Sequence, residues 1–112
     1  MRIKCYCNLY VSEGIRHKKV QVLEALMRQE PTVPVFLLTM AEGDHNQLEF
    51  FSSVFLKQPY YKEKEIFIVG LAESYLAAVD LVEQITCEVL SQTGALNIRE
   101  FILTRQKSFE ES

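Results

Sequence analysis

Three polar turns hold the side chains best suited to chemistry, and each turn follows a predicted strand. In a parallel sheet such turns gather at one edge, where free amide groups at helix N-termini favour an anion. The sequence therefore predicts a small-anion or small-metabolite site, with helix capping as the alternative role of the same residues. The tentative ligand-binding set is Ser12, Arg16, Lys19, Asp44, His45, Ser74 and Tyr75.

Two features of this set bear on reaction chemistry. His45 follows Asp44, so the carboxylate could orient the imidazole as a general base. The basic run Arg16-His17-Lys18-Lys19 could hold a phosphate or carboxylate near a helix end. The run has no glycine-rich loop, and Gly70-Leu71-Ala72 has too few glycines for a dinucleotide fingerprint. The sequence predicts no catalytic residue and no cofactor, and it favours a non-enzymatic role.

The cysteines suggest a further alternative, a thiol switch. Cys5 and Cys7 alternate along a predicted strand, so we expect both side chains on one face. Two thiols at this spacing could bind a metal ion or form a strained disulfide. A zinc site needs four ligands, and Cys87 is the one further cysteine. The sequence therefore predicts no metal site and treats these cysteines mainly as small buried hydrophobic residues.

Surplus tyrosines point to protein contacts. Paired aromatic residues make good anchors at interfaces, and two such pairs occur in predicted exposed positions. The sequence thus predicts, as its first hypothesis, a small binding or assembly module that self-associates into a homo-oligomer, with a dimer as the simplest form. The tentative interface residues are Tyr6, Tyr10, Tyr60 and Tyr61.

Length and composition set the outer bounds of the interpretation. The chain has 112 residues, 48% hydrophobic residues and a net charge of −3, which is typical of one globular domain. We expect a single domain over 1–106 and a flexible tail over 107–112. The acidic balance disfavours nucleic acid and anionic membranes as partners. No apolar run is long enough to span a membrane and residues 1–8 lack the apolar core of a signal peptide, so we expect the cytoplasm.

Hydrophobic periodicity predicts seven elements that would position these residues. Strands are expected over 2–11, 33–40, 66–71 and 98–103, and helices over 12–29, 46–58 and 74–93. The strands 33–40 and 66–71 are almost wholly apolar, which is typical of central parallel strands. The predicted class is α/β, a single three-layer β-α-β-α-β-α-β domain with a mostly parallel four-stranded sheet. The alternative is a ferredoxin-like α+β fold, βαββαβ, with an inserted helix.

The chain also resembles a family of short bacterial α/β proteins with no assigned activity. The resemblance is found in four short segments spread over most of the chain. It implies a complete stand-alone protein, and it implies no catalytic residue, cofactor or substrate. The segments are Tyr10-Val11-Ser12-Glu13-Gly14 with Lys18-Lys19, Gln58-Pro59-Tyr60-Tyr61, Ile68-Val69-Gly70-Leu71-Ala72 with Tyr75, and Asp80-Leu81-Val82-Glu83.

Overall fold

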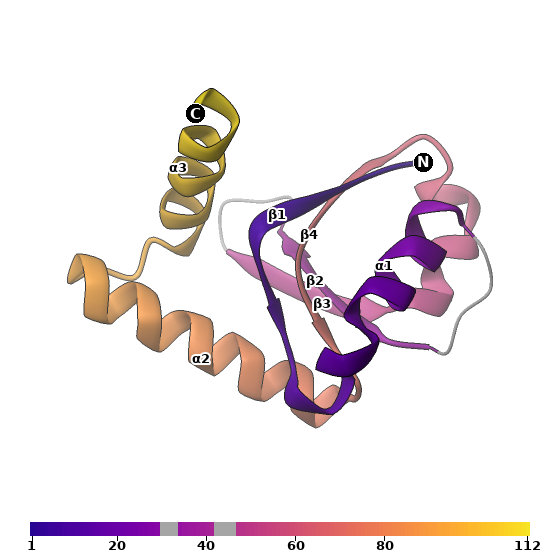
Figure 1. The fold of residues 1–112 in the computed structure, drawn as a ribbon, viewed down its shortest axis with the longest axis horizontal. Coiled ribbons are helices and arrows are strands. Elements are labelled where there is room, and N and C mark those ends of the chain that lie inside the picture. The colour runs from indigo at the N-terminus through magenta and orange to yellow at the C-terminus, as the bar shows by residue number, and fades with distance from the viewer. Residues whose placement is uncertain (30–33, 42–46) are drawn as a thin grey trace.

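A mixed four-stranded sheet with helices on both faces organises the described part of the chain (Figure 1). The computed structural model describes residues 1–29, 34–41 and 47–112. The element order, with η for a 3-10 helix, is β1 (Arg2–Val11), η1 (Glu13–Lys18), α1 (Lys19–Met27), β2 (Phe36–Met40), β3 (Leu48–Ser52), η2 (Ser53–Lys57), η3 (Pro59–Tyr61), β4 (Glu65–Ala72), α2 (Tyr75–Thr93) and α3 (Ile98–Glu111).

The strand order is β1-β4-β2-β3, and the mostly parallel sheet predicted from the sequence is wrong. Only β1 and β4 are parallel; β2 is antiparallel to both β4 and β3. The two apolar strands β2 and β4 do lie side by side, but they run in opposite directions. The reason is that β2 is followed by a hairpin partner, β3, where the sequence predicted a crossover helix. Continuous apolar character shows burial on both faces and leaves strand direction open.

The helix predicted over 46–58 is also wrong. Residues 48–52 form strand β3, which pairs with β2 over five consecutive residues, and residues 53–57 form η2. The expected cap Asn46 lies outside the described residues; Ser52 instead caps η2 by accepting a 3.4 Å hydrogen bond from the Val54 amide. The apolar residues of this segment fit both the helical period of about 3.6 residues and the strand period of two, in which Leu48 and Phe50 alternate with Glu49. Pairing with β2 decides the outcome.

The strand predicted over 98–103 is a helix, α3. Asn97 accepts a 3.0 Å hydrogen bond from the Glu100 amide and so caps the helix, while Ile98, Phe101 and Ile102 form a buried helical stripe. The ferredoxin-like alternative is therefore also wrong, because it requires a last strand. Residues 107–111, which the sequence places in a tail, continue α3.

Three local predictions are confirmed. β1 spans the predicted Arg2–Val11, and β4 covers the predicted 66–71. α2 begins after Ser74, whose hydroxyl accepts a 3.1 Å hydrogen bond from the Ala77 amide, and it ends at Gly94, which has a left-handed φ of 74°. The segment predicted as one helix over 12–29 contains two elements, η1 and α1.

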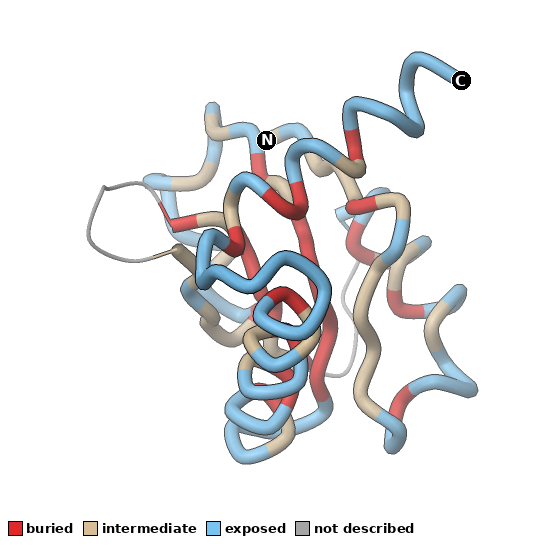
Figure 2. The backbone as a smooth tube through the Cα atoms, turned by 90° about the vertical axis from the view of Figure 1, so that its left-hand side faces the viewer, coloured by how far each residue is buried: buried red, intermediate tan, exposed pale blue. Residues whose placement is uncertain are grey.

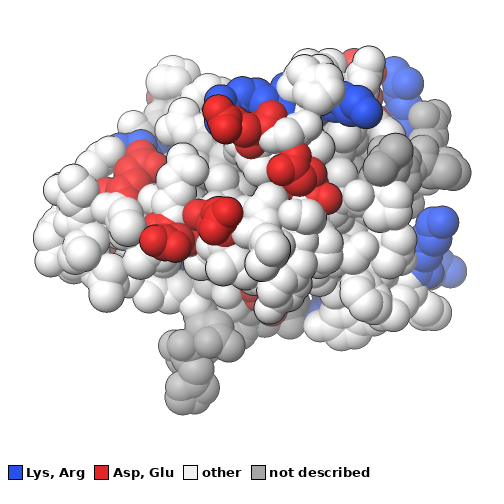
Figure 3. All heavy atoms as spheres, turned by 90° about the horizontal axis from the view of Figure 1, so that it is seen from below, with Lys and Arg blue, Asp and Glu red and all other residues white. Residues whose placement is uncertain are grey.

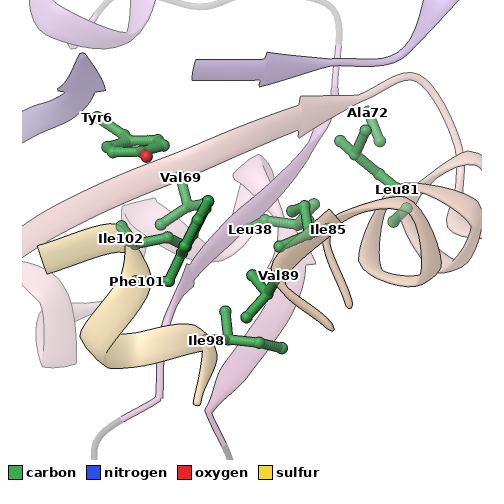
Figure 4. Close-up of a cluster of buried hydrophobic side chains, with 11 residues drawn as sticks. Tyr6, Leu38, Val69, Ala72, Leu81, Ile85, Val89, Ile98, Phe101 and Ile102 are labelled. Carbon is green, nitrogen blue, oxygen red and sulfur yellow. The ribbon is translucent and has the colours of Figure 1, made fainter. Parts of the chain in front are cut away.

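Two hydrophobic clusters lie on opposite faces of the sheet, and the buried residues run through the middle of the molecule (Figure 2). The first joins α2 and α3 to the sheet through residues such as Leu38, Val69 and Ile85 (Figure 4). The second joins η1 and α1 to it through Leu37 and Ile68. Neighbouring residues of β2 and β4 thus face opposite clusters, which explains their continuous apolar sequences.

A bulge interrupts strand β1 between Cys5 and Tyr10. Cys5 pairs with Ile68 and Tyr10 with Gly70, so four residues of β1 intervene where β4 has one. The expected face shared by Cys5 and Cys7 does not form, since Cys5 packs in the α1-side cluster and Cys7 against the α2–α3 cluster. No helix among the described residues is long and apolar enough to cross a membrane.

Candidate functional site

The carboxyl ends of the parallel strands β1 and β4 form a polar corner. The Ser12 amide donates a 3.0 Å hydrogen bond to the Leu71 carbonyl, and the Ser12 hydroxyl accepts a 3.2 Å bond from the Glu73 amide. Ser12 therefore links the start of η1 to the start of α2. Its hydroxyl forms no cap bond within η1, so it has a different task from the helix capping weighed from the sequence.

Glu73 lies against the backbone of Gly14 in this corner. A β-carbon placed on Gly14 would lie 1.2 Å from the Glu73 Oε2 atom. Any larger residue at position 14 would therefore displace the carboxylate. After β1 and β4 end, the chain continues on opposite faces of the sheet: η1 lies on one face and α2 on the other. This arrangement opens a crevice beside the sheet.

A cavity of about 450 Å³ occupies this corner. Among its described lining residues, carboxylates outnumber the one guanidinium, that of Arg16, which disfavours an anion here on electrostatic grounds. Figure 3 shows this side of the molecule, where Asp and Glu side chains spread over the area of α2 and α2 itself contains no Lys or Arg. The lining residues are Val11, Ser12, Glu13, Arg16, Glu73, Ala77, Asp80, Leu81 and Gln84.

The structure brings few of the predicted ligand-binding residues together. Ser12 and Arg16 both line the corner cavity, where Arg16 Nη2 donates a 3.3 Å hydrogen bond to the Val11 carbonyl. Ser74 is occupied as the cap of α2, and Lys19 begins α1 outside the cavity lining. Tyr75, at 60% exposure, packs elsewhere.

The remaining predicted residues, Asp44 and His45, lie outside the described residues. Within the described ranges, no three His, Cys, Asp or Glu side chains converge in a way that could hold a metal ion.

The four predicted interface tyrosines have different surroundings. Tyr6 is buried at 2% exposure in the α2–α3 cluster (Figure 4), and half-buried Tyr10 donates a 2.7 Å hydrogen bond to Glu88 Oε2. Tyr61 stacks on Phe51 with ring centroids 5.4 Å apart. Tyr60 is the most exposed of the four at 58%. The sequence left the Tyr6 side of β1 uncovered because it assigned residues 98–103 to a strand, whereas they belong to helix α3, which packs in the same cluster as Tyr6.

Burial sets the titration of several groups near β1. Burial, and next the hydrogen bond from Tyr10 to Glu88, raises the pKa of the Tyr10 phenol above its ordinary value. Burial also raises the pKa of Tyr6 and of the Cys5 thiol, and the Lys19 ammonium partly offsets the second effect. All three cysteines carry free thiols.

A second and larger cavity lies between α1 and the segment η2–η3. Its volume is about 780 Å³. Two lysines contribute positive charge, while half of the lining residues are apolar, and none of the described lining residues is acidic. The lining residues are Met1, Leu26, Gln29, Ser53, Val54, Leu56, Lys57, Gln58, Pro59 and Lys62.

An aromatic cluster lies on the α2 side of strands β2 and β3. The Tyr75 ring lies 5.3 Å from the Phe50 ring and 6.2 Å from the Phe36 ring, centroid to centroid, with edge-to-face geometry. Phe36, Leu48 and Phe50 are only half-buried. We call this area, formed by the β3 edge with Phe36, Leu48, Phe50 and Tyr75, the β3 surface.

Sequence reasoning missed two groups of residues. Asp80 and Gln84 face the corner cavity from α2, and their helical spacing from Ala77 could have revealed them. Lys57 and Lys62 line the same cavity as Leu26 because η2–η3 packs beside α1. No local sequence signal indicates that these residues share a site.

Comparisons of the chain with protein-family models, with curated proteins and with solved structures find no match. The resemblance to short bacterial α/β proteins therefore stays a prediction.

Proposed function

We propose that this protein is a non-enzymatic assembly module whose copies pair through the β3 surface. The observation that supports the proposal is the difference between the two edges of the sheet. β3 is an edge strand with an unbroken register to β2, and no described strand pairs with its outer side. Such a strand presents a row of backbone donors and acceptors to any chain that can complete the sheet.

The opposite edge, β1, is protected. Its bulge between Cys5 and Tyr10 interrupts a regular ladder, and the Cys7 amide is already bonded to Gln106 of α3 at 2.8 Å. A 2.7 Å ion pair from Lys4 to Glu110 holds α3 beside the same strand. Natural sheets use such devices to prevent unwanted pairing, and the contrast favours β3 as the edge used for assembly.

A second copy of this chain is the partner that suits β3. Two identical strands can pair antiparallel about a two-fold axis, which makes the contact self-complementary. Glu49 is the only charged side chain of β3, so repulsion between copies is limited. On the α2 side of the sheet, Tyr75, whose ring contacts Phe50, and Val79 one turn later add exposed apolar area at 60% and 39% exposure. Aromatic anchors of this kind dominate interface energies.

Sedimentation and light scattering over a concentration series test the proposal. The wild-type chain should show a reversible increase in mass with concentration. Phe50→Lys and Tyr75→Lys should each raise the dissociation constant by at least about tenfold, because each places a charge in a contact that excludes water. Circular dichroism at matched concentration checks that both variants are folded.

Two further variants make the result specific. Val20→Lys changes a side chain of 65% exposure on α1 and should leave association unchanged. Tyr60→Lys tests the surface predicted from the sequence and should also leave it unchanged. A wild-type chain that stays monomeric at several hundred micromolar, or dissociation caused by Tyr60→Lys alone, would refute assembly through β3.

The proposal also includes a reducing compartment, the cytoplasm. Three free thiols, one of them the exposed Cys87, support this assignment. A fractionation experiment with an antibody to the protein would test it.

A further inference from the structure

The cavity between α1 and η2–η3 combines two properties that ligand sites need. Its volume of about 780 Å³ lies within the range of about 300–1,000 Å³ that small-molecule sites occupy. Buried Leu26 contributes apolar surface, together with Leu56 and Pro59. This lining can bury the body of an organic molecule.

The charges at the cavity are of one sign. Lys57 and Lys62 both line it, and none of the described lining residues is a carboxylate. Neither lysine forms an ion pair with a described residue. Two unpaired ammonium groups beside an apolar wall favour an anion that also has an apolar part.

We propose that this cavity binds an organic anion with an apolar body, either a carboxylate or a phosphate monoester. The apolar body would lie against Leu26 and Leu56, and the head group would accept hydrogen bonds from Lys57 and Lys62. The site differs from the anion site expected from the sequence, which falls at the acidic corner beside β1 and β4. The proposed ligand site is also separate from the assembly contact. The cavity lies on the α1 side of the sheet, while the aromatic residues of the β3 surface lie on the α2 side.

Three matched probes separate the two parts of the ligand. Octanoate has both the apolar body and the charge, acetate has only the charge, and 1-octanol has only the body. Titrated into the full chain, octanoate should move backbone amide resonances of residues 53–62 together with Leu26 and Gln29, and it should raise the melting temperature. Acetate and 1-octanol at the same concentration should do neither. Octyl phosphate in place of octanoate then distinguishes a phosphate head from a carboxylate.

Charge removal provides the second test. Lys57→Gln combined with Lys62→Gln should weaken octanoate binding by about tenfold or more, as expected when charge-assisted hydrogen bonds are lost. The double variant Lys18→Gln with Lys107→Gln removes two exposed cations elsewhere and should leave binding unchanged.

Several results would overturn the proposal. One is the absence of any resonance shift with both octanoate and octyl phosphate. Another is equal binding of 1-octanol, which would show an apolar surface without charge selection. A third is resonance shifts centred on β3 and α2, which would place the ligand on the β3 surface.

Discussion

The Cys7 amide donates a 2.8 Å hydrogen bond to the Gln106 Oε1 atom, which joins the bulge of β1 to α3 across 99 residues of sequence. Gln106 is among the few buried polar residues, at 6% exposure. The Gln106 carboxamide thus provides a hydrogen-bond acceptor for the Cys7 amide, because Cys7 has no partner in the interrupted β1–β4 ladder. This hydrogen bond therefore ties the β1 bulge to α3.

Replacing Gln106 should destabilise the fold. Gln106→Leu keeps the approximate size of the side chain but leaves the Cys7 amide without its acceptor, which costs about 1–3 kcal/mol. The free energy of unfolding in urea measures the loss. Gln21→Leu, a change of the same chemistry at an exposed position of α1, is the control and should cost less than about 0.5 kcal/mol. Equal stability of Gln106→Leu and wild type would show that water replaces the acceptor.

Gly70 and Gly94 should tolerate alanine poorly for different reasons. A β-carbon on Gly70 would lie 3.1 Å from the Tyr10 carbonyl oxygen and 3.2 Å from Leu81 Cδ2. Gly70→Ala requires the Tyr10 backbone and the Leu81 side chain to shift by a few tenths of an ångström and should cost about 1–3 kcal/mol. Gly94 has open space around it but a left-handed φ of 74°, so Gly94→Ala should cost about 1 kcal/mol through backbone strain.

Urea denaturation of both glycine variants provides the measurement. If Gly70→Ala were as stable as wild type, the close packing of β1, β4 and α2 around this position would be wrong.

The stability of the protein at alkaline pH should depend on Tyr10. Its pKa is raised in the folded state, first by burial and then by the bond to Glu88. A raised folded-state pKa gives stability that is complete below the unfolded-state pKa of about 10 and is lost as the pH rises toward the folded-state value. Tyr10→Phe removes this ionisation, so its urea midpoint should fall less than that of wild type between about pH 9 and about pH 11.

Tyr60→Phe serves as the comparison for Tyr10→Phe, because it removes an exposed phenol in η3. The comparison of the two variants separates the effect of the Tyr10 position from the general effect of replacing a tyrosine by phenylalanine. Identical slopes for Tyr10→Phe and wild type would argue against the burial of the Tyr10 phenol and against its contact with Glu88.

Thiol reactivity should separate the three cysteines. Cys87 is exposed, whereas Cys5 is half-buried and its thiol pKa is raised by burial. Ellman's reagent at pH 8 should therefore react fastest at Cys87, and Cys87→Ser should remove the fast phase. Because Cys5 and Cys7 pack on opposite faces, mild oxidation of the folded protein should give no Cys5–Cys7 disulfide by mass spectrometry. Detection of that bond in the native state would revive the thiol switch.

Local sequence signals correctly predicted the positions of several helices and strands. Ser74 and Gly94 mark the two ends of α2, and the apolar run before Gly70 marks β4. These signals work because caps, left-handed residues and apolar runs act over a few neighbouring residues. Segment 48–52 shows where such signals fail, since its side chains fit a helix or a strand and only the pairing with β2 decides between them.

The candidate sites depend even more on long-range structure. The sequence placed Ser12 and Arg16 at a strand end, and both do line the corner cavity. It could not show that Glu73 and Asp80 make that corner acidic, or that Lys57 and Lys62 share a cavity with Leu26. The charge of a site is a sum over residues from several elements, so it exists only once those elements are packed.

By itself, then, the sequence determined which segments are buried, where β1, β4 and α2 lie, and how α2 is capped. Only the tertiary structure decided that β2 and β4 run in opposite directions, that β3 replaces a helix, and that β1 is bulged while β3 is regular. The physical reason is range. Burial and capping are properties of neighbouring residues, whereas strand direction, edge exposure and the composition of a cavity depend on contacts between residues far apart in the chain.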